Sequence, residues 1–462
     1  MIQKFILHFL VAIAFCVVAL QPSSAQKRPP NIVLIVSDDM GYADIGVHGS
    51  KDIPTPNIDS LAASGIRFTD AYVTGPYCSP TRAGLLTGRY PQRFGHEFNI
   101  PDAAGNMDHG LPVSERTLAD RLRESGYRTA IYGKWHLGAA EKFHPLSRGF
   151  DEFYGFLGGA HTYLPLRAGE KNMMFDGRKQ VEEPDYLTEA LAARSVQFIR
   201  NNKARPFFLY LAFNAVHTPM QAPDKYLARF PNIADRARRT YAAMLSAMDD
   251  GVGMVVRAIK DQGLERDTLI VFLNDNGGPT MQGTSINASN NAPLRGSKRQ
   301  TWEGGIRVAF IASWRGRLSQ GRVENKPVIQ LDIMPTALTA AGVKVKSEWR
   351  IDGVDLLPLM SGKSSKAPHD ALYWRLGEQM AVRKGDWKLV KSSEGRLFDS
   401  DHAMPYNISQ AGLYNLRSDI SETNNVAGTN PKVVSELARL WERWNSGLTR
   451  PLWSPGTRPK QD

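Results

Sequence analysis

The sequence predicts an α/β protein with a large sheet flanked by helices, followed by a smaller C-terminal antiparallel sheet and one helix. Up to about residue 341, short apolar runs alternate with amphipathic stretches of helical length. Beyond residue 350 the pattern changes to short strand-turn-strand signals ahead of a final helix. The chain of 462 residues is long enough for two such parts, and 42% hydrophobic with 22% charged residues is typical of a folded protein.

The N-terminus resembles a secretory signal peptide. Lys4 precedes an apolar stretch at residues 5–20, and Ser23 and Ala25 occupy the small-residue positions of a cleavage site. A membrane-spanning helix needs ~20 apolar residues, so this shorter stretch argues against an anchor. We therefore expect residues 1–25 to be removed and the mature protein to be periplasmic or secreted, with no stable membrane anchor.

The predicted catalytic domain covers residues 26–350. Its first strand, residues 31–36, is a continuous apolar run, which is typical of a strand buried on both faces. Further strands are expected at residues 128–132, 207–213, 268–273 and 308–313. Helices are expected at residues 56–64 (with Thr55 or Asn57 near the cap), 82–86, 118–125, 187–201, 233–262 and 331–341. The polar, glycine-containing segment 283–299 is expected to be a loop.

The remainder, residues 351–462, is the predicted C-terminal subdomain, with a boundary placed to within ~15 residues. Residues 380–390 have strand-turn-strand chemistry around Gly385-Asp386. A short strand at residues 413–416 and a terminal helix at residues 431–448 complete it. Because no low-complexity linker separates the two parts, we expect them to pack together.

Polar clusters directly follow four of the predicted strands. The carboxyl ends of strands in an open α/β sheet are where ligands bind. Clusters that lie far apart in the sequence are therefore expected to converge in one active site. They are Asp38-Asp39, Lys134 with His136, His217, and Asp275-Asn276.

The acidic clusters offer only oxygen ligands. The carboxylates of Asp38, Asp39 and Asp275 and the amide of Asn276 suit Ca²⁺ or Mg²⁺ and match zinc poorly. Taken singly, an Asp-Asp pair after a strand is a helix cap or a turn, and Asp-Asn-Gly-Gly is an ordinary turn sequence. Only their joint placement at strand ends favours a metal site.

Cationic and hydrogen-bond-donating side chains are expected at the same edge. Lys134 and His136 lie two positions apart, so in an extended chain they would point the same way. Taken singly, each histidine is better explained as a structural residue and each lysine as a solvated surface group. Several donors facing a hard cation, however, suit an oxyanion ester. The set is Arg82, Lys134, His136, His217 and Lys298.

Cys78 is the third functional candidate. Removal of the signal peptide takes away Cys16 and leaves one cysteine, which cannot form an internal disulfide in an oxidising compartment. Its neighbours do not resemble a core strand. A helix that begins at Cys78 would direct backbone N–H groups and a positive dipole end at a bound anion.

The chain has 57 Lys and Arg against 46 Asp and Glu, a formal net charge of +11. The basic residues are scattered among acidic ones and form no long block, so nucleic acid is not the expected partner. A surface suited to polyanions, among them sulfated polymers, is the better interpretation.

These motifs resemble a known family. Residues 78–89 (CSPTRAGLLTGR) resemble the sulfatase signature C-x-P-x-R with its LLTGR continuation, and residues 133–138 (GKWHLG) resemble the second signature. The similarity continues through Asp275-Asn276 and residues 295–298 (RGSK) to residues 413–416 (LYNL). It covers nearly the whole mature chain and is specific to the type I, formylglycine-dependent, arylsulfatase-like sulfatases, whose fold is alkaline-phosphatase-like.

The resemblance implies that a formylglycine-generating or sulfatase-maturating enzyme oxidises Cys78 to formylglycine (3-oxoalanine). The hydrated gem-diol would be the nucleophile, and one of its oxygens would bind one calcium ion. Calcium and Arg82 would favour the ionised diol. The other calcium ligands would be Asp38, Asp39, Asp275 and Asn276.

The same resemblance implies roles for the donors. His217, helped by Lys298, would protonate the leaving oxygen, and His136 would deprotonate the sulfated diol. The two histidine roles could be exchanged without contradicting the sequence. Lys134 would orient the formylglycine and bind sulfate oxygens. Ser297 replaces the second glycine of the usual RGGK-like loop, and Ala309 stands where proline is common.

Two alternative functions are less well supported. A phosphatase or phosphodiesterase of the same superfamily usually has a Ser or Thr nucleophile and two zinc ions. A non-catalytic, calcium-dependent binding protein for sulfated glycans would be expected to have lost catalytic residues. The expected substrate is a sulfated carbohydrate, a galactose or N-acetylgalactosamine sulfate, with His161, Tyr163 and Arg295 as predicted sugar contacts besides Lys134, His217 and Lys298.

Overall fold

The computed structural model describes residues 28–101, 107–165, 173–393, 408 and 410–453. The predicted signal peptide, residues 1–25, lies outside the described residues. No helix among the described residues combines the length and the apolar composition that crossing a bilayer requires.

The centre of the large sheet consists of four parallel neighbours in the order β9 (Thr268–Asn274), β1 (Asn31–Ser37), β8 (Phe207–Ala212) and β4 (Arg128–Lys134). In register, Val36 of β1 lies opposite Ala212 of β8 and Leu273 of β9. The strands therefore end at nearly the same level. Every residue of β1, β8 and β9 is buried, as expected for a sheet covered on both faces.

Six further strands extend this sheet, which has the order β11-β2-β10-β9-β1-β8-β4-β5-β6-β7. Because β10 runs antiparallel to β9 and β6 antiparallel to β5, the sheet is mixed. A separate two-stranded sheet joins β12 to β3. The bounds are β2 (Ile66–Phe68), β3 (Ala71–Tyr72), β5 (Glu152–Phe156), β6 (Met174–Asp176), β7 (Lys179–Val181), β10 (Phe310–Ser313), β11 (Arg322–Glu324) and β12 (Val328–Ile329).

The side chains of β1 alternate between two cores. Val33 and Ile35 pack with α2 (Pro56–Ala63), α5 (Leu187–Asn201) and α7 (Arg236–Asp261). Ile32, Leu34 and Val36 pack with α3 (Cys78–Thr87), α4 (Leu118–Glu124) and α9 (Ile333–Ala340). Period-two alternation of an all-apolar strand thus gives a three-layer arrangement. Shorter helices are α6 (Asp224–Leu227), α8 (Glu303–Ile306) and α10 (Leu357–Met360).

Short 3₁₀ turns lie in the connections between these elements. They are Gly46–His48, Pro91–Phe94, Glu141–Phe143, Pro145–Ser147, Glu265–Asp267, Gln330–Asp332, Ser347–Trp349 and Ala427–Thr429.

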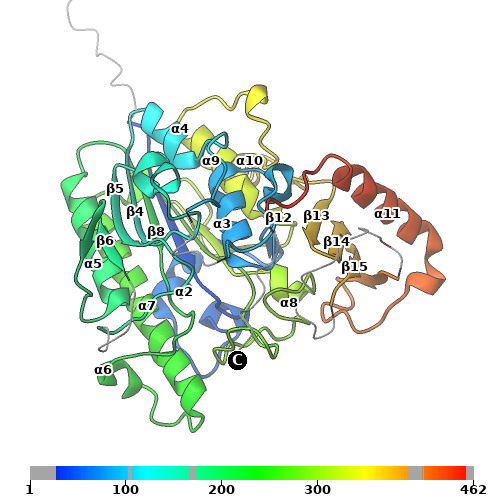
Figure 1. Ribbon diagram of the computed structural model, residues 1–462, viewed down its shortest axis with the longest axis horizontal. Coiled ribbons are helices and arrows are strands. Elements are labelled where there is room, and N and C mark those ends of the chain that lie inside the picture. The colour runs from blue at the N-terminus through cyan, green and yellow to red at the C-terminus, as the bar shows by residue number, and fades with distance from the viewer. Residues whose placement is uncertain (1–27, 102–106, 166–172, 394–407, 409, 454–462) are drawn as a thin grey trace, which may run out of the picture.

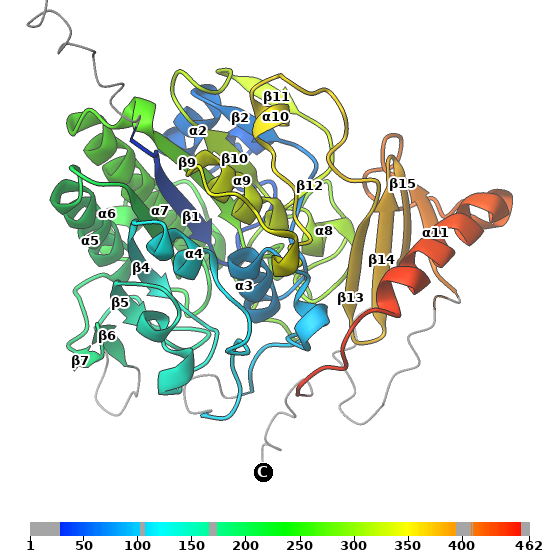
Figure 2. The same cartoon turned by 90° about the horizontal axis from the view of Figure 1, so that it is seen from above.

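The C-terminal part is a four-stranded antiparallel sheet covered by α11 (Pro431–Asn445) at one end of the molecule (Figures 1 and 2). Its apolar core includes Trp374 and Trp441 together with Tyr72 of the large part. The Trp374 indole also donates to the Val73 carbonyl (2.7 Å). The two parts therefore share a core, and the predicted fold class is confirmed. The strands are β13 (Leu372–Leu376), β14 (Gln379–Lys384), β15 (Trp387–Lys391) and β16 (Gly412–Asn415).

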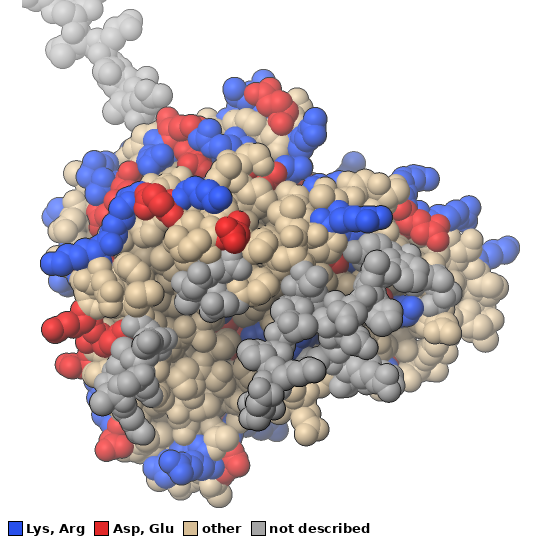
Figure 3. All heavy atoms as spheres, viewed as in Figure 1, with Lys and Arg blue, Asp and Glu red and all other residues tan. Residues whose placement is uncertain are grey.

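Lys and Arg side chains are interspersed with Asp and Glu over the face drawn in Figure 3. The excess of positive charge is therefore spread over this face rather than gathered in one basic patch.

Candidate active site

The structure brings the four predicted polar clusters together at the carboxyl edge of the sheet. Asp38-Asp39 follows β1, Asp275 follows β9, and Lys134 is the last residue of β4. His217 lies five residues beyond the end of β8. Because these strands are parallel neighbours with aligned ends, residues separated by more than two hundred positions become neighbours.

Backbone hydrogen bonds fix the turn that carries the two aspartates. The Asp38 N–H donates to the Ala215 carbonyl (2.9 Å), and the Val216 N–H donates to the Asp38 carbonyl (2.7 Å). Asp39 has a left-handed backbone (φ 59°), which is unusual for a residue other than glycine. Asn287 Nδ2 donates to its carbonyl (3.0 Å) and supports that turn. The turn aims both carboxylates across the sheet edge.

Three fully buried carboxylates form the centre of the site. Oxygens of Asp38, Asp39 and Asp275 all lie within 4.8 Å of one another, and each residue is 0% exposed. Burial, and then the charge of Asp275, raise the pKa of Asp38 to about 7. Such a cluster is stable only with positive charge beside it.

Each carboxylate has its own cationic partner. Lys134 Nζ lies 2.5 Å from Asp38 Oδ2, and Lys298 Nζ lies 2.7 Å from Asp39 Oδ2. The guanidinium of Arg82 contacts Asp275 Oδ2 (2.9 Å), and Arg82 Nη1 also donates to the Lys134 carbonyl (3.2 Å). With all three carboxylates ionised, three anions and three cations balance, so a bound divalent cation would leave the site positive and suited to an anionic ester.

The donor set fits a hard cation. Asn276 Nδ2 donates to Asp39 Oδ1 (2.7 Å), whereas Asn276 Oδ1 is buried without a hydrogen-bond partner among the described residues. An orphaned buried amide oxygen is costly unless it binds something positive. Together with the oxygens of three carboxylates, it provides the oxygen-only environment that calcium prefers.

Cys78 is the first residue of α3, and its Sγ lies 3.8 Å from Asp38 Oδ1. The thiol is 1% exposed, and burial raises its pKa to about 12. The unmodified side chain is therefore not a thiolate at neutral pH, and a thiol in this setting is a poor nucleophile. The thiol could also join Asp38 and His217 around a metal, since one ligand atom of each lies within 4.8 Å of the others.

His217 presents one ring nitrogen to the site. Its Nδ1 lies 2.6 Å from the Thr218 carbonyl, which can only accept, so Nδ1 carries the proton. Its Nε2 lies 3.4 Å from Asp39 Oδ2. Burial lowers the pKa of His217 to about 3, despite the raising effect of Asp39.

His136 also belongs to the site, but not in the way that its spacing predicted. Its backbone is left-handed (φ 56°), so the expectation of an extended Lys134–His136 segment is wrong. Strand β4 ends at Lys134, and the next two N–H groups, of Trp135 and His136, donate to the carbonyls of Phe156 and Leu157 (3.1 Å each). Burial, and then the charges of Lys134, Arg82, Lys298 and His217, lower the pKa of His136.

The predicted sugar contacts have other partners. The Tyr163 hydroxyl is 2.6 Å from the Asn214 carbonyl and 2.8 Å from the His217 carbonyl, so it supports the backbone of His217. His161 Nε2 lies 3.3 Å from Glu183 Oε1. Arg295 stacks on Trp302, 3.9 Å from the ring centroid, and donates to a carbonyl of the C-terminal part. Each of the three residues thus has a partner within the protein, and its contact with a sugar stays a prediction.

Ser297, which replaces a glycine of the usual motif, is also structural. Its hydroxyl accepts from the N–H groups of Thr280 (2.9 Å) and Met281 (3.1 Å). At 1% exposed it is covered by the chain. The substitution thus ties the Lys298 loop to residues 278–281, an effect that the motif comparison did not predict.

The sequence analysis did not predict the residues that form hydrogen bonds to the site residues without belonging to the motifs' predicted catalytic set. Ser79 Oγ donates to the His136 carbonyl (2.7 Å) and contacts His96 Nε2 (2.6 Å). Arg82 Nη1 lies 3.4 Å from the Tyr210 hydroxyl. Of these residues, only Ser79 could have been suspected from the sequence, because it is adjacent to Cys78. His96 and Tyr210 come close to the site only when the chain folds.

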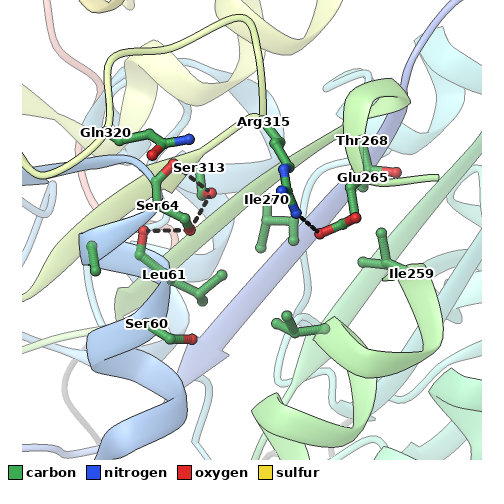
Figure 4. A pocket seen from close by; sticks show the side chains of 12 residues that line it. Ser60, Leu61, Ser64, Ile259, Glu265, Thr268, Ile270, Ser313, Arg315 and Gln320 are labelled. Carbon is green, nitrogen blue, oxygen red and sulfur yellow. Dashed lines mark hydrogen bonds and ion pairs between the residues drawn. The ribbon is translucent and has the colours of Figure 1, made fainter. Parts of the chain in front are cut away.

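A cleft of about 340 Å³ at the amino end of β9 does not share these features (Figure 4). The charged groups of its lining, Glu265 and Arg315, pair with each other at 2.6 Å. Its other polar groups are hydroxyls and one amide, including Ser64 and Ser313 in mutual contact (3.0 Å). The chemistry of the molecule is thus concentrated at the opposite edge of the sheet.

The comparison with family models decides the identity of this fold and site. A model described as "Sulfatase" matches residues 30–343, and one described as "N-sulphoglucosamine sulphohydrolase, C-terminal" matches residues 296–446. The chain belongs to the sulfatase family. It is a sulfuric ester hydrolase, as its motifs predicted. The match reaches across the shared core into the small sheet, consistent with one packed unit.

Curated relatives agree with this assignment. The sulfatase is 36% identical over 387 residues to N-acetylgalactosamine-6-sulfatase of Mus musculus, covering 79% of this chain and 72% of the relative. It is 34% identical over 466 residues to arylsulfatase A of Homo sapiens, covering 91% and 89%.

Solved structures also resemble the sulfatase. The crystal structure of Ps i-CgsB in complex with k-i-k-neocarrahexaose has a TM-score of 0.84 at 38% identity, covering 93% of this chain and 96% of that one. The PsFucS1 sulfatase from Pseudoalteromonas sp. has a TM-score of 0.76 at 28% identity, covering 91% of each chain.

Proposed function

We propose that this sulfatase releases sulfate from a sulfated carbohydrate, a galactose or N-acetylgalactosamine sulfate, using formylglycine at position 78 and one calcium ion. The observation that carries the proposal is the position of Cys78. It begins α3 with its Sγ 3.8 Å from Asp38, beside three carboxylates that are each paired with a cation. The carbohydrate class is supported by the similarity to an N-acetylgalactosamine-6-sulfatase and to a protein crystallised with a neocarrahexaose.

Asp38, Asp39, Asp275 and Asn276 would hold the calcium ion, whose positive charge would polarise a sulfate oxygen and favour an ionised nucleophile. Residue 78 would supply that nucleophile as a hydrated aldehyde after maturation, and in this form the high pKa of the thiol is irrelevant. Conversion depends on a formylglycine-generating or sulfatase-maturating enzyme as a transient partner.

The cationic side chains would orient the ester. Lys134 and Arg82 are held rigidly by Asp38 and Asp275, so their positive charges are fixed before substrate binds. Lys298 faces the same site through Asp39. Fixed charges need no reorganisation as the S–O bond breaks and negative charge builds up on the leaving oxygen, and such pre-organised fields are a large source of rate enhancement.

Proton transfer would be divided between the two histidines. Because Nδ1 of His217 is already bonded to the Thr218 carbonyl, any second proton goes to Nε2, the nitrogen that faces the site. Burial lowers the pKa of His217 to about 3, so Nε2 would gain this proton only when the negative charge of a bound ester offsets the cost of burial. In that bound state His217, with Lys298, would be the donor to the leaving oxygen. His136 would then be the base that allows sulfate to leave residue 78.

The test begins with full-length protein co-expressed with a formylglycine-generating enzyme. Peptide mass spectrometry measures conversion of Cys78, and ion chromatography measures sulfate released from galactose, N-acetylgalactosamine and glucosamine sulfates, with and without a calcium chelator. We expect chelator-sensitive release from the first two substrates and none with Cys78→Ala. Fully converted protein that releases sulfate only from glucosamine sulfates would overturn the substrate assignment, and an unconverted thiol in active protein would overturn the nucleophile.

The localisation proposal rests on residues 1–25 alone. We propose that the mature enzyme is periplasmic or secreted, where polymeric sulfated glycans are accessible. N-terminal sequencing of the exported protein would be expected to begin at Gln26.

A further inference from the structure

The loop that carries Lys298 depends on groups outside itself for its shape. Residues 295–302 contain no strand or helix, and Arg299 has a left-handed backbone (φ 74°) that strains a residue other than glycine. The peptide groups of such a loop need fixed partners if it is to keep one conformation. Part of that support comes from the nucleophile segment, because the Arg299 N–H donates to the Pro76 carbonyl (2.6 Å).

Besides the Ser297 contacts, further support comes from Gln379, the first residue of β14 in the small sheet. Its Nε2 donates to the Arg299 carbonyl (2.8 Å), and its Oε1 accepts from the Thr301 N–H (3.3 Å). Ser392 Oγ also donates to this Oε1 (2.7 Å), which fixes the orientation of the amide. At 3% exposed, the side chain is inaccessible to water that could replace these bonds. One amide therefore contacts both peptide groups that flank Gln300, and it shares the Thr301 N–H with Ser392 Oγ (3.1 Å).

This arrangement connects the small sheet to the chemistry. Gln379 holds the carbonyl of Arg299, the residue directly after Lys298, and the N–H of Arg299 reaches the carbonyl two residues before Cys78. Lys298 Nζ in turn lies 2.7 Å from Asp39 Oδ2. A shift of the loop would therefore move the Lys298 ammonium relative to both the nucleophile and the carboxylates.

We propose that Gln379 is a positioning residue that holds the Lys298 loop against the nucleophile segment. The proposal rests on the proposed function for the role of Lys298 toward the leaving oxygen. The C-terminal sheet would thus contribute to catalysis indirectly. Gln379 would hold the Lys298 loop in place without touching the substrate.

The test compares wild type, Gln379→Ala, Gln379→Glu and a control, Leu437→Ala. The Glu variant keeps the acceptor for Thr301 and replaces the donor to Arg299 with an oxygen that repels the carbonyl. Leu437 is a buried side chain of α11 on the other side of the small sheet. Its truncation destabilises the subdomain without removing a hydrogen bond to the loop.

Hydrogen exchange followed by mass spectrometry is the first readout, because it does not depend on activity. Peptides covering residues 295–302 are expected to exchange faster in both Gln379 variants than in wild type or Leu437→Ala. Unchanged exchange in the Gln379 variants would overturn the proposal even if wild type released no sulfate from any ester, an outcome that would separately overturn the proposed function.

Leaving-group dependence is the second readout, since a merely structural defect would slow all substrates alike. For a sulfated sugar, whose alcohol leaves poorly, kcat of the Gln379 variants is expected to fall at least ~tenfold. For nitrophenyl sulfate, whose phenol needs little proton donation, the fall is expected to be much smaller, with KM little changed for either substrate. Equal losses on both substrates, unchanged kcat, or the same selective loss in Leu437→Ala would each overturn the positioning role.

Discussion

At the scale of single residues, Asn276 provides one atom of the proposed metal site. Its Nδ2 is bonded to Asp39, whereas its Oδ1 is a buried acceptor without a partner among the described residues. Leaving a buried acceptor unsatisfied costs about 1–3 kcal/mol. Because this oxygen lies beside the three carboxylates, the proposed calcium ion would satisfy it.

We predict that Asn276→Leu weakens calcium binding at least ~tenfold, because one oxygen ligand is lost. Isothermal titration calorimetry on protein freed of calcium measures the change. Asn276→Asp is the matched control, since it keeps an oxygen there and loses only the donation to Asp39. Wild-type affinity in the Leu variant would remove Asn276 from the ligand set.

Gly159 must lack a side chain because the His136 ring lies against it. A Cβ built on it would lie 2.7 Å from both Nε2 and Cε1 of the His136 ring, which is closer than atoms in contact can be. Its backbone is not left-handed, so the constraint is the space taken by His136 rather than the conformation of the glycine.

We predict that Gly159→Ala lowers kcat by about 10- to 100-fold while Tm changes little, because the added methyl group displaces the His136 ring. Steady-state kinetics and thermal melts on the same samples measure both quantities. Gly428→Ala is the control, since its Cβ would meet nothing within 4 Å. A Gly159→Ala enzyme with wild-type kcat would show that the position of His136 does not limit the reaction.

At the scale of elements, the contact between His369 and Asp332 connects the segment before the small sheet to the start of α9. His369 Nε2 lies 2.8 and 2.9 Å from the two carboxylate oxygens of Asp332, at the start of α9. Asp332 also accepts from the Ile329 and Val354 N–H groups. Burial disfavours the charged imidazole, but Asp332 outweighs burial and raises the pKa of His369 above its ordinary value of 6.5.

Since the folded-state pKa is raised, this contact stabilises the fold fully below about pH 6.5 and loses its contribution as pH rises through the folded-state pKa. We predict that His369→Gln costs about 2 kcal/mol of unfolding free energy at pH 6 and less at pH 9. Urea denaturation at the two pH values measures the difference. A cost that does not depend on pH would mean that His369 is neutral in the folded protein.

Element prediction from sequence succeeded where apolar runs were long. The helix predicted at residues 187–201 matches α5 residue for residue, and the run at residues 31–36 is most of β1. Strands of two or three residues such as β3, β11 and β12 were not predicted, because so few residues show no periodicity. Their pairing depends on partners elsewhere in the chain.

At the scale of the whole molecule, the net positive charge of the protein would attract an anionic sulfate ester. The formal net charge is +11, and Figure 3 shows basic and acidic residues mixed over one face. A diffuse positive field attracts a polyanion over many residues, whereas a small ester experiences mainly the fixed charges of the site.

We predict that KM for a sulfated polysaccharide rises several-fold between 50 and 300 mM salt, while KM for an aryl sulfate changes less. The reason is that salt shortens the Debye length, which is about 10 Å at 0.1 M. Initial rates on both substrates across this range measure the effect. Equal salt dependence for the two would exclude a contribution from the wider surface.

The sequence by itself determined the chemistry of this protein. Cys78, Arg82 and Lys134 lie in short motifs whose residues predicted sulfate-ester hydrolysis. The apolar runs predicted that the polar clusters follow the ends of strands. Only the tertiary structure decided which cation neutralises which carboxylate, since Lys298 and Asp39 are 259 positions apart. It also decided the left-handed backbone of His136 and the hydrogen bond from Gln379 to the Lys298 loop. Motifs record local residue types, whereas ion pairs and supporting contacts arise only when distant segments pack together.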